Sequence, residues 1–444
     1  MSLTAHTARF GEIMKLRPSL LLPIIIFCRI VSVPATQARV TGENRAQTAT
    51  WTLAKALARV LEQNPEMVVS ELEIQAAAAR VSQAGVKPNP EIEVTSENLA
   101  FPGIGSGIFR FTESTVQISR RLELGGKRDL RIRAAEKDVA VASTQLEVKK
   151  AELVAATARA FAEVLSEQQR LANQQELGRL AQEAHSVVVE RVSAGKVSPV
   201  EQTRSAVALA AAQLEEEKHR RALVAAKDRL AMLWGGSHSD IEAVQGLFEI
   251  PAAPAEIPEA CIQNNPDVRL AAASTDARDA ALAMETANRK PDLTLSAGFR
   301  RLNAESEQVL VAAVSMPLPI FDKRRGAIAE ARARLDQSRS EEAAVQRRLR
   351  AALAQARHDH AGALREAAIL RQIALPAAKE AVSAVEEGYR LGKFELINLL
   401  DSQRTYAELQ GRYIESVTTG LKAAIEIERL ARCDSPAQPS NPGK

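Results

Sequence analysis

Four short motifs occur twice in this 444-residue chain, in the same order and 196 to 203 residues apart. LEQNPEM at 61–67 returns as IQNNPDV at 262–268, VKPNP at 86–90 as RKPDL at 289–293, ISRRLELGGKR at 118–128 as VSMPLPIFDKR at 314–324, and VSAGKVSPVEQ at 192–202 as YRLGKFELINL at 389–399. A fixed period means that each half builds the same structural unit. The sequence therefore predicts a tandem repeat of about 200 residues.

A separate segment precedes the two repeats. Basic Lys15 and Arg17 come before an apolar run at 20–27, and small residues follow at Ala35 and Ala38. This order is typical of a secretory signal peptide, and the apolar run is too short to span a membrane. The predicted division is a signal peptide at 1–38, a first repeat at 39–250, a linker at 251–260, a second repeat at 261–430, and a disordered tail at 431–444.

Hydrophobic periodicity switches twice within each repeat. Alternating apolar and polar residues predict strand pairs at 91–124 and 292–318, each preceded by a short and a longer helix. Helical periodicity then runs through 127–194 and 323–391, where each helix would be about 100 Å long. Such a helix does not fit within one globular domain, so a bundle or tube is expected. Return helices are predicted at 198–233 and 395–430.

Each long helix is predicted to end at a tight reversal. Gly195 and Gly392 suit the left-handed C-terminal cap that lets a chain turn back. Ser198 and Glu201 have the spacing of a capping box at the start of the first return helix. The result is a pair of helical hairpins, one per repeat, with a glycine at each tip.

Charge and composition exclude several function classes. Residues 1–38 hold four basic residues and one acidic residue, so the rest of the chain has 54 of each. A nucleic-acid reader would carry a basic excess, so no nucleic-acid partner is expected. Aromatic residues make up only 3% of the chain, which is poor for an enzyme pocket.

Catalytic and metal-binding motifs are missing from the sequence. There is no P-loop and no Gly-x-Ser-x-Gly elbow, so neither an enzyme nor a cofactor is expected. His358 and His360 would lie about 200° apart on a helix and do not form a chelating pair. The three cysteines define no metal site, and a disulfide between Cys261 and Cys433 is left open.

The plan resembles that of the TolC-type outer membrane efflux proteins. SENLAFPGIGSG at 96–107, ISRRLELGGKRDLRIRAAE at 118–136 and MPLPIFDKRRGAIAEARA at 316–333 are most similar to the heavy-metal branch, of cobalt-zinc-cadmium type. The resemblance implies a mainly α fold with a small β part. Long periplasmic helical hairpins would form an α-barrel, and four strands would join a trimeric twelve-stranded β-barrel in the outer membrane.

The same resemblance implies a function and a set of partners. The chain would be the passive outer membrane conduit of a tripartite efflux system for divalent heavy-metal cations. Its partners would be two further copies of itself, a periplasmic adaptor (membrane fusion) protein, an RND-type inner-membrane pump and outer membrane lipid. Two alternatives stay open: a multidrug or type I secretion channel of the same fold, or a periplasmic coiled-coil adaptor or scaffold.

Candidate site residues gather at the two helix tips. By resemblance, the gate or constriction candidates are Tyr389, Glu201, Asp401 and Asn398, and the adaptor-docking candidates are Gly195, Lys196, Leu391, Gly392, Lys393 and Phe394. Phe394 stands where the family has an arginine, so the closing contacts cannot be identical, although a hydrogen bond from Tyr389 to Glu201 is still compatible with the sequence. Plainer interpretations compete: Glu201 as a capping-box residue, Asp401 as a solvated charge, and Tyr389 as ordinary packing.

Overall fold

The computed structural model describes residues 49–98, 112–253 and 257–431, all within one compact unit. The first repeat contains β1 (Ala49–Trp51), α1 (Leu53–Gln63), α2 (Pro65–Ala84), β2 (Glu91–Glu97), β3 (Glu113–Leu122), α3 (Lys127–Ser193), α4 (Pro199–Met232), the 3-10 turn η1 (His238–Asp240) and β4 (Ile241–Val244). The second contains α5 (Glu259–Gln263), α6 (Pro266–Ala287), β5 (Leu293–Leu302), β6 (Glu307–Ser315), α7 (Arg325–Ile369), the π turn η2 (Leu370–Ala374), α8 (Leu375–Arg390) and α9 (Leu396–Leu430). The predicted signal peptide and all of the predicted tail beyond Ala431 lie outside the described residues.

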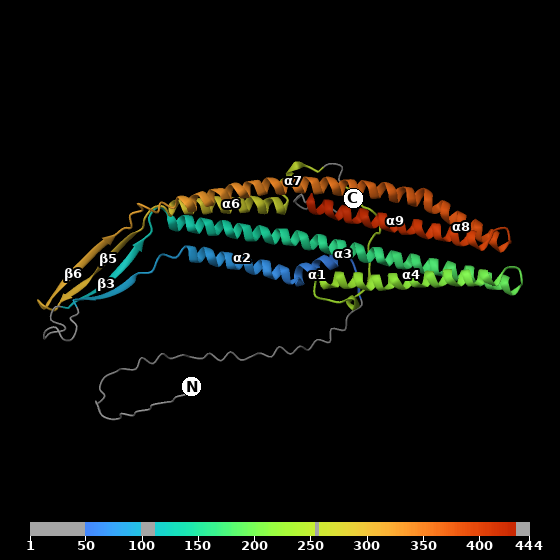
Figure 1. Ribbon diagram of the computed structural model, residues 1–444, viewed down its shortest axis with the longest axis horizontal. Coiled ribbons are helices and arrows are strands. Elements are labelled where there is room, and N and C mark those ends of the chain that lie inside the picture. Colours follow the sequence, from blue (N-terminus) through green and yellow to red (C-terminus); the bar gives the residue numbers. More distant parts are fainter. Residues whose placement is uncertain (1–48, 99–111, 254–256, 432–444) are drawn as a thin grey trace, which may run out of the picture. The chain divides into compact units, whose positions relative to one another are not determined.

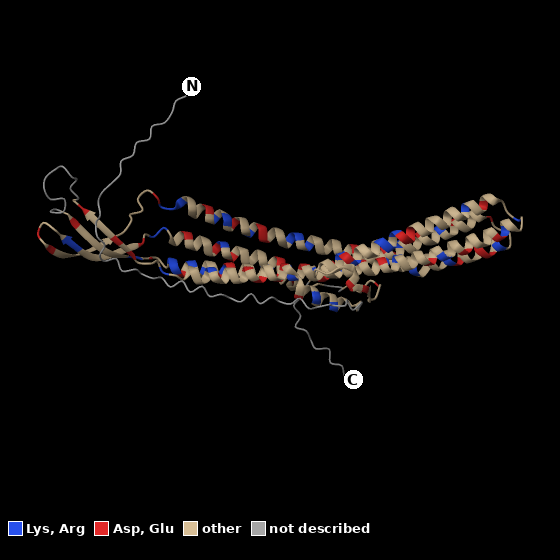
Figure 2. Ribbon diagram, turned by 90° about the horizontal axis from the view of Figure 1, so that it is seen from below, with Lys and Arg blue, Asp and Glu red and all other residues tan. Residues whose placement is uncertain are grey.

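Long helices packed side by side make up most of the unit. Near the sheet, α3 packs against α2 and α6, and α6 packs against α7; farther along, α3 packs on α4 and α9, and α9 packs on α7 and α8 (Figure 1). Acidic and basic residues are interspersed along these helices in Figure 2. Among the described helices, none carries a run long and apolar enough to cross a membrane. The prediction of a mainly α fold with a small β part is confirmed.

The repeated Asn-Pro motif closes each repeat on itself. Asn64 accepts a hydrogen bond from the N–H two residues on, at 2.8 Å, and donates to the carbonyl of Leu233 at the end of α4, also at 2.8 Å. Asn265 caps α6 in the same way, at 2.9 Å, and donates to the carbonyl of Leu430 in α9 at 3.1 Å. Proline follows each asparagine as the first helical residue, where its missing N–H costs nothing. One side chain therefore starts one helix and ends another.

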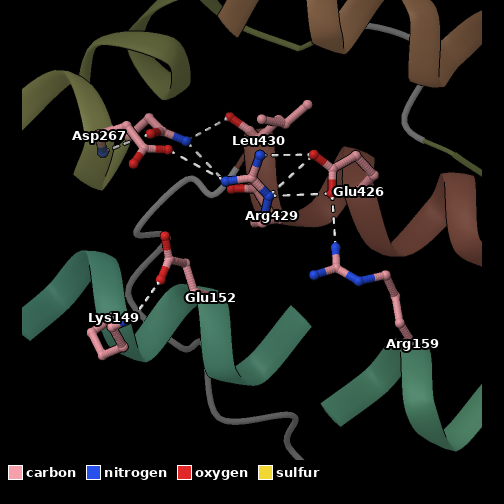
Figure 3. Close-up of polar contacts among 8 residues, drawn as sticks. Lys149, Glu152, Arg159, Asp267, Glu426, Arg429 and Leu430 are labelled. Atoms are coloured by element: carbon pink, nitrogen blue, oxygen red, sulfur yellow. Dashed lines mark hydrogen bonds and ion pairs between the residues drawn. The ribbon is translucent and has the colours of Figure 1, made fainter. Parts of the chain in front are cut away.

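An ion-pair network next to Asn265 links the second repeat to α3. Arg429 lies between Asp267, at 3.3 Å, and Glu426, at 2.7 Å (Figure 3). Glu426 also accepts a hydrogen bond from Arg159 of α3, at 3.1 Å. Networks in which carboxylates are shared between two guanidinium groups are worth more than isolated surface pairs. This one joins α6, α9 and α3.

Four antiparallel strands form a sheet in the order β2-β3-β5-β6. Val94, Val116, Phe299 and Leu310 face one another across all four strands and are 68%, 52%, 65% and 72% exposed. A water-soluble sheet would bury such a row, so this face suits contact with lipid.

Polar side chains occupy the opposite face of this sheet. Gln117 donates to Glu93 at 2.7 Å, and Arg300 donates to Thr115 at 3.0 Å and to Glu113 at 3.2 Å. Thr115 is only 6% exposed. On the two central strands, β3 and β5, the apolar side chains are therefore more exposed than the polar ones, which reverses the arrangement of a soluble half-buried sheet.

The second long helix departs from the prediction in one respect. An unbroken helix over 323–391 was expected, but the structure has a π turn at Leu370–Ala374 between α7 and α8. Pro376 is the second residue of α8, and a proline inside a helix removes one N–H and crowds the carbonyl four residues earlier. The wider π turn accommodates that carbonyl. The first repeat has no such proline in α3, which runs for 67 residues.

The first repeat has a compact core around two short strands. The parallel strands β1 and β4 pair there, and Trp51 stacks on Trp234 with ring centroids 4.8 Å apart. Cys261 in α5 is buried and disulfide-bonded, while Cys433 lies outside the described residues.

Candidate functional site at the helix tips

Both helical hairpins reverse at a left-handed glycine. Gly195 has φ +67° and Gly392 has φ +75°, a region that favours glycine because it has no Cβ. The N–H of Lys196 bonds to the carbonyl of Arg191 at 2.9 Å, and the N–H of Lys393 bonds to that of Gly388 at 2.7 Å. These bonds satisfy the last carbonyls of α3 and α8 and bring the return helices alongside.

Tyr389 is the buried centre of the tip. It is 1% exposed and packs among side chains of both hairpins: Ala184, Val188, Leu396 and Leu399. Its hydroxyl donates to the carboxylate of Glu201 at 3.1 Å. The bond joins α8 of the second repeat to α4 of the first, across 188 residues.

Glu201 does not act as a capping-box residue. Ser198 alone caps α4, through its hydroxyl oxygen and the N–H of Val200 at 3.3 Å. Among the described residues, the hydrogen bond of the Glu201 carboxylate goes to Tyr389. The capping interpretation was wrong because the tertiary partner lies within reach of the same carboxylate.

Arg191 completes the cluster, and sequence reasoning missed it. Its guanidinium lies over the Tyr389 ring, 4.5 Å from the ring centroid, and also donates to the Tyr389 carbonyl oxygen. Cation–π contacts of this kind are stronger when shielded from water. The signal that could have identified Arg191 was the absence of an arginine beside Gly392. Arg191, four residues before Gly195, supplies a guanidinium from the other repeat instead.

The environment of Tyr389 keeps its hydroxyl protonated. Burial, followed by the hydrogen bond to Glu201, raises the pKa of Tyr389 to about 12. The hydroxyl therefore stays a donor throughout the physiological pH range.

Asp401 and Asn398 are not part of this cluster. Both are exposed on α9, and the backbone N–H of Asn398 bonds to the carbonyl of Glu395 at 3.1 Å in the first turn. The structure thus brings together Tyr389 and Glu201 and leaves the other two gate candidates on the surface.

Apolar side chains stand exposed around the tips. Leu391 is 60% and Phe394 is 46% exposed, and Ile397 and Val200, which sequence reasoning did not single out, are 54% and 58% exposed. The Phe394 ring lies against Gly388, where an added Cβ would come within 2.2 Å of it. Lys196 and Lys393 are exposed beside them.

No metal centre accompanies this site in the part of the chain that the structure describes. Within those ranges, no three His, Cys, Asp or Glu side chains could jointly hold an ion. His360 is buried and bonds to the Pro251 carbonyl at 2.8 Å, whereas His358 is exposed.

Comparison with known proteins places this architecture. The chain matches the family described as "Outer membrane efflux protein" over residues 56–236 and 257–431, one match per repeat. It is 31% identical to the cobalt-zinc-cadmium resistance protein CzcC of Cupriavidus metallidurans, covering 85% of this chain and 89% of CzcC. It is 29% identical to the nickel-cobalt-cadmium resistance protein NccC of Alcaligenes xylosoxydans xylosoxydans, over 66% of this chain and 68% of NccC.

The fold has a close counterpart among solved structures. A membrane protein from Pseudomonas aeruginosa superposes with a TM-score of 0.74 at 20% identity, covering 85% of this chain and 90% of that one. With both repeats matched over most of their length, the chain belongs to the outer membrane efflux protein family.

Proposed function

We propose that three copies of this chain form a passive conduit that carries divalent heavy-metal cations from the periplasm through the outer membrane. The conduit would be one part of a tripartite efflux system, joined by a periplasmic adaptor to an RND-type inner-membrane pump. Selection of the metal then belongs to the pump, since no metal centre lies among the described residues.

The open sheet is the observation that carries this proposal. Within the described residues, β2 and β6 each have one strand partner and so present unpaired backbone edges, next to an exposed apolar face. A lipid-facing sheet with free edges is unfavourable, and closed barrels need about eight strands or more. Three copies, each pairing β6 with β2 of the next, would give a closed twelve-stranded barrel. The metal cargo is supported by the relatives named for cobalt, zinc, cadmium and nickel resistance.

The helix tips supply the proposed gate. Tyr389 would hold α8 against α4 in the closed conduit, through Glu201 at its hydroxyl and Arg191 at its ring. Separation of the two hairpins breaks both contacts, so opening requires an outside contribution of free energy. Docking of the adaptor on the exposed Leu391 and Phe394 would supply this free energy. Asp401 and Asn398, exposed on α9, would line the constriction, where the Asp401 carboxylate would attract cations and the neutral Asn398 would not.

Two experiments test the proposal. Envelope fractionation should recover an SDS-resistant trimer in the outer membrane; a soluble monomer would exclude the conduit. A deletion strain should then become sensitive to cobalt, zinc or cadmium but not to organic drugs. Sensitivity to drugs alone would identify a multidrug channel of the same fold instead.

A further inference from the structure

A basic cavity lies at the junction between the sheet and the helices. It has a volume of about 790 Å³ and lies where β3 and β6 lead into α3 and α7. Two of the residues that line it are acidic, Asp292 and Asp322, and five are basic: Arg121, Lys127, Arg289, Lys290 and Arg324. Figure 2 shows this concentration of basic residues between the strands and the helices.

The acidic residues of the cavity are already engaged. Asp292 accepts from the Lys127 ammonium at 2.6 Å, and the Lys127 side chain is 10% exposed, so this pair is largely shielded. Asp322 accepts from the backbone N–H of Arg324 at 2.8 Å. The Arg324 guanidinium is 3.5 Å from Glu285 of α6.

Arg289 and Lys290 remain as unpaired cations. Within the described part of the chain, neither has a carboxylate within 4.0 Å, and both are exposed. Lys290 is also held in place: its aliphatic stem lies against Gly125, where an added Cβ would come within 2.5 Å of Lys290 Cδ. Gly125 has φ +80°, so the turn requires glycine for its backbone as well. Arg121 reaches the cavity from the polar face of β3, the face of Thr115, so we leave it out of the proposed contact.

Exposed apolar side chains stand on the same rim. Leu318 and Phe321 line the cavity and are 68% and 98% exposed, and Ile320 between them is 63% exposed. They follow directly from β6, where Leu310 and Val314 are exposed on the apolar face of the sheet. An anionic group beside a continuous apolar surface is the pattern of a lipid: a charged head with a hydrocarbon tail.

We propose that this junction binds the headgroup phosphate of an anionic phospholipid in the leaflet that faces the helices. Arg289 and Lys290 bond to the phosphate oxygens, and Leu318, Ile320 and Phe321 contact the acyl chains. Both α3 and α7 also begin at the cavity without a side-chain cap, which adds to the positive potential but does not carry the proposal. The site rests on the proposed function, because it requires the sheet to lie in the outer membrane.

Native mass spectrometry of the full-length, detergent-solubilised protein tests this site. The probes are phosphatidylglycerol and phosphatidylcholine with the same acyl chains, each added alone. We expect wild type to retain phosphatidylglycerol at least about tenfold better, since two fixed cations meet its net negative charge. Arg289→Gln with Lys290→Gln should abolish this preference. Lys218→Gln with Arg221→Gln, which removes the same charge from the exposed face of α4, should retain it.

Three results would overturn the proposal. Equal retention of the two lipids by an intact trimer excludes a headgroup site while leaving the conduit untouched. Displacement of phosphatidylglycerol by millimolar inorganic phosphate alone identifies a free-anion site. Loss of the SDS-resistant trimer in the double variant means that a second copy of the chain covers the junction. Absence of any trimer in wild type would instead refute the proposed function.

Discussion

Tyr389→Phe removes one hydroxyl from the tip and leaves the aromatic ring beneath Arg191 in place. The lost bond joins a donor that is 1% exposed to a carboxylate 3.1 Å away. Hydrogen bonds to charged groups contribute about 1.5–3 kcal/mol each. The proposed trimer would have three such tips, so concerted closure would lose about 4–9 kcal/mol. Because about 1.4 kcal/mol is a factor of ten, the closed-to-open ratio should fall about a thousandfold or more.

Single-channel recording of the purified trimer in a planar bilayer measures this change directly. Tyr389→Phe should raise the open probability at unchanged open-state conductance, because the pore walls are not altered. Tyr413→Phe is the matched control: it removes the same hydroxyl from α9, away from the tip cluster. An intact trimer of the Tyr389→Phe variant with wild-type open probability would show that the bond is not a latch.

Glu201 and Arg191 provide the partner variants. Glu201→Gln keeps a hydrogen-bond acceptor but removes its charge. The free energy of closure that this variant loses should be about half of that lost in Tyr389→Phe. The double variant should open little more than Tyr389→Phe alone, since both changes remove one bond. Additive effects would mean that the two side chains act separately. Arg191→Gln should add to either, because it removes a different contact.

Three further predictions concern the fold. Asn265→Ala should lower the free energy of unfolding by about 2–3 kcal/mol, because the variant loses a helix cap and the bonds to α9. Asn64→Ala should lower it by slightly less. Denaturant titration checks both variants, and an unchanged free energy of unfolding would refute the shared-cap argument. Gly392→Ala should lower the free energy of unfolding by about 1–2 kcal/mol, because alanine is strained at this positive φ, and should speed tryptic cleavage at Lys393. Gly362→Ala, inside α7 with open space around it, should have neither effect. Cys261→Ser should release one free thiol in the denatured, unreduced protein without residues 1–38, because Cys261 is disulfide-bonded; an unchanged thiol count would contradict that bond.

Much of the fold could be predicted because its signals are local or periodic. Asn-Pro caps, alternating strands and tip glycines each act within a few residues, and the duplication repeated every signal. The π turn was missed because a lone proline reads equally as a kink, a break or a bulge. The structure has the bulge, a π turn at Leu370–Ala374.

Prediction of the candidate site was less complete. Tyr389 and Glu201 could be identified from their distance in sequence to the tip glycines. Their bond and the role of Arg191 depend on how α3, α4 and α8 cross. Asp401 and Asn398, the other two gate candidates, lie elsewhere on α9.

The sequence by itself determined that two similar units follow one another, that each is a strand pair between long helices, and where each hairpin turns. These properties depend on neighbours along the chain. Only the tertiary structure decided that β3 pairs with β5, that Tyr389 meets Glu201 and Arg191, and that basic Arg289 and Lys290 share a rim with Phe321. The physical reason is that a contact between residues in different helices and strands depends on which of their faces meet, and the spacing of residues in the chain does not fix that.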